Sequence, residues 1–200
     1  EMEDDPGFAT AIGAVGFLGR LLLWSVLLLT FLKSALNMDI SAFVASLGVP
    51  GPTLEGYLFP ETYRFAEGLP PEALLSEMAT RYRSFWTPER RARLDSLSLD
   101  ERGLVTLASI VEEEARIPEE RPVIAGVYVN RLEIGMLLQA DPTVQYALGE
   151  PKPRLLFADI DRVADNPYNT YTHTGLPPGP IASPGEAALE AALRPADVPF

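Results

Sequence analysis

The chain has 200 residues, of which 47% are hydrophobic and 22% are charged, and it contains no cysteine. This composition is typical of a globular protein with one sizeable core, and it excludes a disulfide scaffold and a cysteine nucleophile. The formal net charge of −12 repels phosphate backbones, so we expect no nucleic-acid binding. The single histidine, His173, leaves no second imidazole for a histidine-rich zinc site. We therefore expect no metal and no cofactor, and catalysis by carboxylates, hydroxyls or amides.

The N-terminal part of the chain is strongly apolar. Residues 8–32 carry one charge, Arg20, and as a helix they would reach roughly 38 Å, enough to cross a hydrocarbon core of about 30 Å. The sequence therefore predicts a transmembrane helix at 8–32, with a buried core helix or two short helices as the alternative. Lys33 follows this segment and acidic residues precede it, which by the positive-inside rule places the rest of the chain in the cytoplasm.

Glycine and proline residues around position 50 mark a boundary, which divides the chain into an N-terminal segment (1–36), a linker (37–52) and a domain (53–200). Apolar periodicity, prolines at first turns and terminal glycines predict helices in the domain at 71–86, 88–97, 100–116, 119–134, 141–149 and 186–194. Short strands are expected around 57–66 and 136–139. The predicted fold class is thus α+β and helix-rich, with an ordered surface loop at 166–185 and a capping box formed by Ser183 and Glu186.

Three glutamates end the most regular of these helices, 100–116. Its apolar stripe, which includes Leu104 and Val111, places Glu113 on the opposite side, in solvent, and Glu112 and Glu114 at the two borders. A carboxyl at such a border is partly buried, which suits a general acid. Periodicity does not choose between the two, and a solvated helix end without a chemical role is the alternative.

Four sequence motifs favour a chemical role for this glutamate run. They are LEGYLFPETY at 54–63, ASIVEEE at 108–114, VNRLEIGMLLQADPTVQYALG at 129–149 and YNTYTHTGLPPGPIASPG at 168–185. In this order they closely resemble the YceG-like endolytic murein transglycosylases, over residues 54–200. The resemblance ends before the final strand and C-terminal segment of that family, which implies a catalytic domain truncated at its C-terminus. Residues 37–52 leave no room for the small LysM-like module that family members usually carry.

The resemblance implies a bacterial enzyme anchored in the cytoplasmic membrane, with its catalytic domain on the outer side. Such an enzyme cleaves the MurNAc-GlcNAc bond within peptidoglycan strands, leaves 1,6-anhydro-MurNAc ends and terminates the elongation of nascent strands. The catalytic glutamate of the family matches the first Glu after Ser-Ile-Val, which is Glu112. The implied partners are glycan strands, the membrane and peptidoglycan synthases (penicillin-binding proteins). The alternatives are a catalytically inactive glycan-binding or scaffold module, and a hydrolytic glycosidase that pairs Glu112 with Glu114 or Asp141.

Further site residues are expected within the same motifs. Their hydroxyl, amide, carboxylate and aromatic groups suit contacts with sugars, and we expect such contacts from Gln139, Asp141, Tyr168, Asn169, Thr170 and Tyr171. Supporting roles are expected for Glu114, Glu61 and Asn130. Glu55 and Glu61 lie in the first motif and could both support the site, with surface salt bridges as the alternative for each. For Asp141 the alternative is a helix N-cap, and for residues 168–171 it is loop packing. His173 is expected to be structural.

Overall fold

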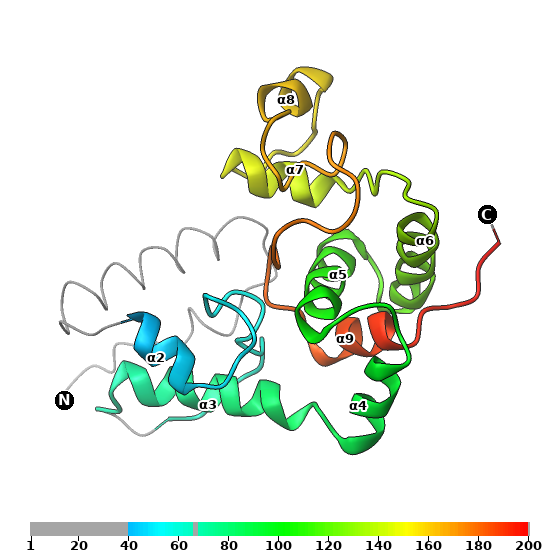
Figure 1. Ribbon diagram of the computed structural model, residues 1–200. Coiled ribbons are helices and arrows are strands. Elements are labelled where there is room, and N and C mark those ends of the chain that lie inside the picture. The colour runs from blue at the N-terminus through cyan, green and yellow to red at the C-terminus, as the bar shows by residue number, and fades with distance from the viewer. Residues whose placement is uncertain (1–39, 66–67, 200) are drawn as a thin grey trace, which may run out of the picture.

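The computed structural model describes residues 40–65 and 68–199. These residues form helices joined by loops (Figure 1), namely α2 (Ile40–Ser46), α3 (Pro71–Ser84), α4 (Pro88–Asp95), α5 (Glu101–Glu114), the 3-10 turn η1 (Pro118–Glu120), α6 (Arg121–Glu133), α7 (Asp141–Leu148), α8 (Phe157–Arg162) and α9 (Glu186–Leu193). The helix-rich part of the predicted fold class is confirmed. The strands expected around 57–66 and 136–139 are wrong for the described residues, none of which lies in a strand. One backbone hydrogen bond, from Gln139 N to Thr170 O (3.1 Å), joins the second segment to the loop without forming a ladder.

Helix α5 lies at the centre of the fold and packs against α6, α7 and α9 (Figure 1). Every residue from Leu104 to Val111 is buried, so the apolar stripe predicted from the periodicity was too narrow. A helix covered on all sides must also bury its small polar residues. Thr106 and Ser109 meet this demand by donating hydrogen bonds to carbonyl oxygens one turn earlier in the same helix.

A second, smaller apolar cluster joins the first described helix to α3. It consists of Val44, Leu47, Leu54, Leu75 and Ala79. Helix α2 and the first residues after it therefore pack against α3, although they lie within the stretch 37–52 that the sequence assigned to a linker.

The ends of several helices agree with the sequence-based prediction. Pro122 lies in the first turn of α6, and Gly135 (φ 67°) and Gly149 (φ 71°) take the left-handed conformation just beyond α6 and α7. The predicted N-cap at Asp141 is wrong, because Ala140 occupies that position and Asp141 is the first helical residue. This frees the Asp141 carboxylate for a contact outside its helix.

The capping box predicted before α9 is also wrong. Gly185 is the N-cap residue, and no side chain caps this helix. Ser183 instead accepts a hydrogen bond from the backbone N–H of Gly56 (3.3 Å), which ties the loop before α9 to the segment 54–63. The Ser183 hydroxyl, which the sequence spacing predicted to cap the helix, is therefore used in a tertiary contact instead.

Within residues 40–65 and 68–199, no helix combines the length and apolar character needed to cross a membrane. The transmembrane helix predicted at 8–32 lies outside the described residues.

Candidate active site around Glu112

The carboxyl of Glu112, in the last turn of α5, is held by two hydrogen-bond donors from two other helices. Arg121, the first residue of α6, donates from Nη2 to Oε1 at 2.8 Å, and the backbone N–H of Gly185, at the start of α9, donates to Oε2 at 3.2 Å. The side chains of Arg121 and Glu112 are 16% and 26% exposed, so the pair is shielded but still reachable from solvent. The ends of three helices thus fix the orientation of one carboxyl.

Gly185 lets the chain pass close to Glu112. A Cβ atom at this position would lie 3.6 Å from Glu112 Oε2 and 3.8 Å from the Cγ atom of Pro60. The motif that contains Pro60 therefore approaches the same point as α5 and α9. Three of the four sequence motifs meet here, which the order of the motifs along the chain did not reveal.

Four charged side chains brace the start of α9 beside Gly185. Arg81 of α3 bridges Glu61 (2.7 Å) and Glu186 (2.9 Å), and Arg90 of α4 also binds Glu186 (2.9 Å). Single exposed ion pairs contribute little, but a shared network restrains the elements that carry it. Of the residues with an expected supporting role, Glu61 thus acts on Glu112 only indirectly, by way of Arg81 and the start of α9.

The other two glutamates of the run differ from the sequence-based expectation. Glu113, expected in solvent, is partly buried. Burial first, and then the negative charge of Glu112, raises the pKa of the Glu113 carboxyl. Partial removal from water first, and then the charge of Asp141, raises the pKa of the Glu114 carboxyl, while Arg116 lowers it. The end of α5 therefore presents two carboxyls with raised pKa values beside the one that is held.

Asp141 and Tyr171, both expected to contact substrate, lie together. The Tyr171 hydroxyl donates to Asp141 Oδ1 at 2.6 Å. The charge of Asp141 acts on both Glu114 and Tyr171, so the pair lies near the end of α5. Gln139, two residues before Asp141, is exposed and has a left-handed backbone (φ 54°), which is uncommon for a residue with a side chain. Asp141 and Tyr171 thus form a polar pair near Glu114.

Asn169 and Thr170 are buried and serve the loop that carries them. The Asn169 amide donates to the carbonyl oxygens of Ile160 (3.0 Å) and Val163 (3.1 Å). The Thr170 hydroxyl accepts from Ala140 N (3.0 Å) and pairs with the Thr143 hydroxyl (2.8 Å). With their polar atoms used in this way, their expected contact with substrate stays a prediction.

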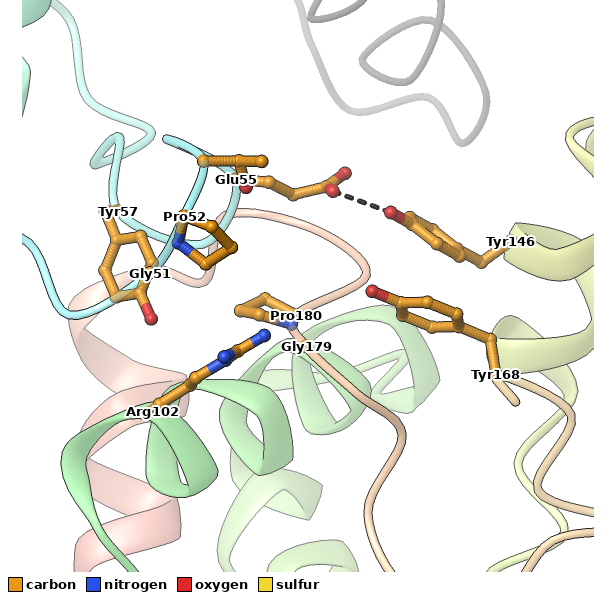
Figure 2. A pocket seen from close by; sticks show the side chains of 10 residues that line it. Gly51, Pro52, Glu55, Tyr57, Arg102, Tyr146, Tyr168, Gly179 and Pro180 are labelled. Atoms are coloured by element: carbon orange, nitrogen blue, oxygen red, sulfur yellow. Dashed lines mark hydrogen bonds between the residues drawn. The ribbon is translucent and has the colours of Figure 1, made fainter. Parts of the chain in front are cut away.

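The remaining expected site residues lie elsewhere. Asn130 donates to the Val198 carbonyl (2.9 Å) and so fastens α6 to the segment after α9. His173 is exposed and its Nδ1 lies 3.0 Å from the Thr172 hydroxyl. Tyr168 lines a pocket near the start of α5, together with Glu55 and Tyr146 (Figure 2). The predicted residues therefore do not form one site: Tyr168 lies near the beginning of α5, while Asn130 and Asn169 hold other segments together.

Sequence reasoning did not find Arg121. Arg121 follows Glu112 by nine positions, across the turn η1, and no periodic pattern links the two residues. An arginine soon after an acidic run was the available signal. Among the described residues, no group of three or more His, Asp and Glu side chains is arranged to hold a metal ion.

Comparison with known proteins shows which proteins this chain is similar to. A model of the YceG-like family matches residues 22–200. The endolytic murein transglycosylase of Bacillus subtilis (strain 168) is 43% identical over 145 residues, which cover 71% of this chain and 39% of that protein. The protein of the same name from Streptococcus pneumoniae serotype 2 is 39% identical over 144 residues, which cover 70% of this chain and 26% of that protein.

The fold is shared with a solved structure as well. The crystal structure of a putative yceG-like protein from Listeria monocytogenes superimposes with a TM-score of 0.66 and 34% identity, over 96% of this chain and 56% of that one. The chain belongs to the YceG-like family, and its helical fold is shared with this structure. It spans less than half the length of the curated relatives.

Proposed function

We propose that this chain carries the catalytic domain of an endolytic peptidoglycan lytic transglycosylase, with Glu112 as its general acid and base. The observation that carries the proposal is the Glu112 carboxyl, oriented by Arg121 and Gly185 yet open to solvent. The names of the relatives, endolytic murein transglycosylases, support the reaction class. The expected substrate is the glycan strand of peptidoglycan.

The proposed reaction uses one carboxyl twice. Protonated Glu112 donates its proton to the glycosidic oxygen as the bond between that oxygen and the muramyl C1 breaks. The carboxylate then takes the proton of the 6-hydroxyl of the same sugar while that oxygen forms a bond to C1. The product is a 1,6-anhydro-muramyl end, no water is consumed and Glu112 is again protonated. Because the attacking hydroxyl belongs to the substrate, no second carboxylate is needed to activate water.

Replacement of Glu112 by Gln tests this assignment. Gln keeps the shape of the side chain and one acceptor oxygen, so the fold should persist, whereas proton transfer is lost and activity should fall by roughly 10²-fold to 10⁴-fold. The assay is mass spectrometry of peptidoglycan incubated with the purified chain, and Glu119→Gln, at an exposed position on η1, is the matched control. Anhydro-ended products at wild-type rate from Glu112→Gln would refute the role of Glu112. Absence of products from every variant would favour the inactive glycan-binding module.

A second candidate function, glycoside hydrolysis, is favoured by one observation. Glu114 and Asp141 are close enough for the charge of Asp141 to act on the Glu114 carboxyl, so a second carboxyl is available near Glu112, and hydrolytic glycosidases use a pair of carboxyl groups. In that reaction water attacks C1, so the fragment that contains C1 carries a new reducing end and is one water heavier than the corresponding anhydro fragment. The same mass spectra distinguish the two reactions.

The setting of the reaction is also part of the proposal. The expected location is the bacterial cytoplasmic membrane, crossed once, with the catalytic domain on the outer side and peptidoglycan synthases as partners. The predicted apolar segment 8–32 and the family of the chain support it, while Lys33 favours the opposite orientation. Protease treatment of intact spheroplasts tests the orientation, because only an external domain is digested.

A further inference from the structure

A cavity lined by both polar and apolar groups lies near the start of α5, at the other end of this helix from Glu112. It has a volume of about 150 Å³, room for about five water molecules, and its walls come from the segment 51–57, the start of α5, helix α7 and the loop 168–180. Figure 2 shows the side chains of Glu55, Tyr57, Arg102, Tyr146 and Tyr168 around it. The mechanism proposed for Glu112 uses none of these groups.

One wall of the cavity holds a polar group without a partner. The Tyr57 side chain is 1% exposed, and its hydroxyl has no hydrogen-bond partner among the described residues. Burial raises the pKa of Tyr57 to about 12, so the hydroxyl keeps its proton and is a donor at neutral pH. A buried hydroxyl without a hydrogen bond is unfavourable, so a ligand acceptor atom that reached it would supply the missing bond.

The opposite wall offers aromatic faces and an acceptor. The Tyr146 and Tyr168 rings lie 4.5 Å apart between centroids, tilted by 34°, and the Tyr146 hydroxyl donates to Glu55 Oε2 at 2.6 Å (Figure 2). Burial raises the pKa of the Glu55 carboxyl, with the Tyr146 hydrogen bond acting against it. Flat apolar faces beside hydroxyl and carboxyl groups are a combination that suits a sugar ring.

Gly179 brings two donors to one point in the cavity. A Cβ atom at Gly179 would lie 3.3 Å from the Tyr168 hydroxyl oxygen and 3.5 Å from Arg102 Nη2. Arg102 already donates from Nη2 to the Pro178 carbonyl (2.6 Å), so its guanidinium is fixed in place. The Tyr168 hydroxyl and the Arg102 guanidinium therefore both lie beside Gly179, and a methyl group added at this position would crowd both of them.

The charges within the cavity select a neutral ligand. An anion would be attracted by Arg102 and repelled by an ionised Glu55, and a cation would meet the reverse. Hydroxyl and acetamido groups donate and accept hydrogen bonds without net charge, so they can use both side chains. An N-acetylated amino sugar combines such groups with an apolar ring face.

Two stretches of chain connect the cavity to Glu112. Arg102 precedes Glu112 by ten residues of α5, a rise of about 15 Å, or a few sugar rings. The loop before α9 follows this helix, since Pro178 O accepts from Arg102, Ile181 N donates to the Ser109 hydroxyl and Gly185 N reaches Glu112.

The segment 55–60 follows the same course. Glu55 lines the cavity, Gly56 N donates to Ser183, and Pro60 lies beside Gly185. Both stretches thus lead in the same direction from the cavity to the Glu112 carboxyl.

We propose that the cavity formed by Glu55, Tyr57, Arg102, Tyr146 and Tyr168 is a remote subsite that binds one N-acetylated sugar ring of a glycan strand whose scissile bond lies at Glu112. The inference rests on the proposed function for the identity of the strand. It gives these motif residues a role in holding the substrate away from the point of cleavage.

Binding of chitotriose, a trimer of N-acetylglucosamine, tests the subsite. The whole chain, kept in detergent micelles, is titrated with chitotriose and followed by backbone amide NMR shifts. Gly179→Ala places a methyl group between the two donors, and its backbone conformation does not require glycine, so we expect the Kd to rise at least tenfold. Tyr168→Phe removes one donor and should weaken binding as well. Tyr63→Phe removes a hydroxyl that bonds the Phe59 carbonyl outside the cavity, and it should leave the Kd unchanged.

The outcomes separate this inference from the proposed reaction. Glu112→Gln should retain chitotriose binding while it loses product formation, and Gly179→Ala should lose binding while its residual products keep anhydro ends. The subsite is refuted if chitotriose does not bind the wild-type chain at millimolar concentration, or if Tyr168→Phe and a folded Gly179→Ala bind as wild type does. If binding is present and anhydro products are absent, the subsite stands and the proposed reaction fails.

Discussion

Removal of the Arg121 guanidinium is the most direct test of how the Glu112 carboxyl is held. The hydrogen bond from Arg121 Nη2 to Glu112 Oε1 is 2.8 Å long and joins side chains that are 16% and 26% exposed. A partly buried hydrogen bond between charged groups contributes about 1.5–3 kcal/mol. If the transition state needs this orientation in full, Arg121→Ala should lower kcat/KM by roughly 10-fold to 150-fold, at about 1.4 kcal/mol per factor of ten.

The assay follows the release of anhydro-muropeptides over time, at a temperature where thermal unfolding curves show each variant to be folded. Arg121→Lys keeps the charge but not the planar donor group, so it should recover part of the activity. Arg154→Ala, at an exposed arginine in the connection between α7 and α8, is the matched control and should react at the wild-type rate. Arg121 is expected to act as a positioning residue through Glu112 alone.

A double variant makes the reasoning refutable. Because Arg121 is expected to act only through Glu112, Arg121→Ala should cause no further loss in a Glu112→Gln chain. A full additional loss in that background, or wild-type activity of a folded Arg121→Ala, would show that the ion pair does not position the catalytic group.

Two further predictions concern stability. The raised pKa of Glu113 means that the folded state favours its protonated form, so stability present below about pH 4.5 is lost as the pH rises through the folded-state pKa. Glu113→Gln should therefore raise the Tm at pH 7 and change it less at pH 4, and equal effects at both pH values would contradict this. Asp100 caps α5 by accepting from Gly103 N (2.7 Å), so Asp100→Ala should cost about 1 kcal/mol, or about 2–4 °C in Tm, while exposed Asp95→Ala should have no measurable effect.

The bounds of several helices could be predicted from the sequence because they depend on the backbone preferences of single residues. Proline at first turns and glycine just beyond last turns act through their own backbone preferences, so the bounds of α6 and α7 came out close to those observed. The predicted helix caps were wrong where a side chain could serve either as a cap or as a partner in a tertiary contact. Ser183 and Asp141 both have the side chains of helix caps, and tertiary partners, Gly56 and Tyr171, took them instead.

The burial of α5 shows why periodicity has a limit. A stripe of apolar residues reports one buried face, yet α5 is covered on several sides, and small residues such as Thr106 and Ser109 carry no signal of this in the sequence. For the same reason Glu113 was placed in solvent by its angle on the helix, although neighbouring elements partly cover it. The strands expected at 57–66 and 136–139 failed because a strand needs a partner, which a local apolar pattern does not supply.

The sequence alone determined the class of the domain, since its helices and its four motifs are properties of short stretches of chain. It also indicated Glu112 as the residue to test. Only the tertiary structure decided what surrounds that carboxyl, because Arg121, Gly185 and Pro60 come from three separate segments whose meeting depends on packing around α5. The structure likewise gave Tyr168 and Tyr171, three residues apart in the chain, different partners, since Tyr168 lines the cavity with Arg102 and Tyr171 bonds Asp141.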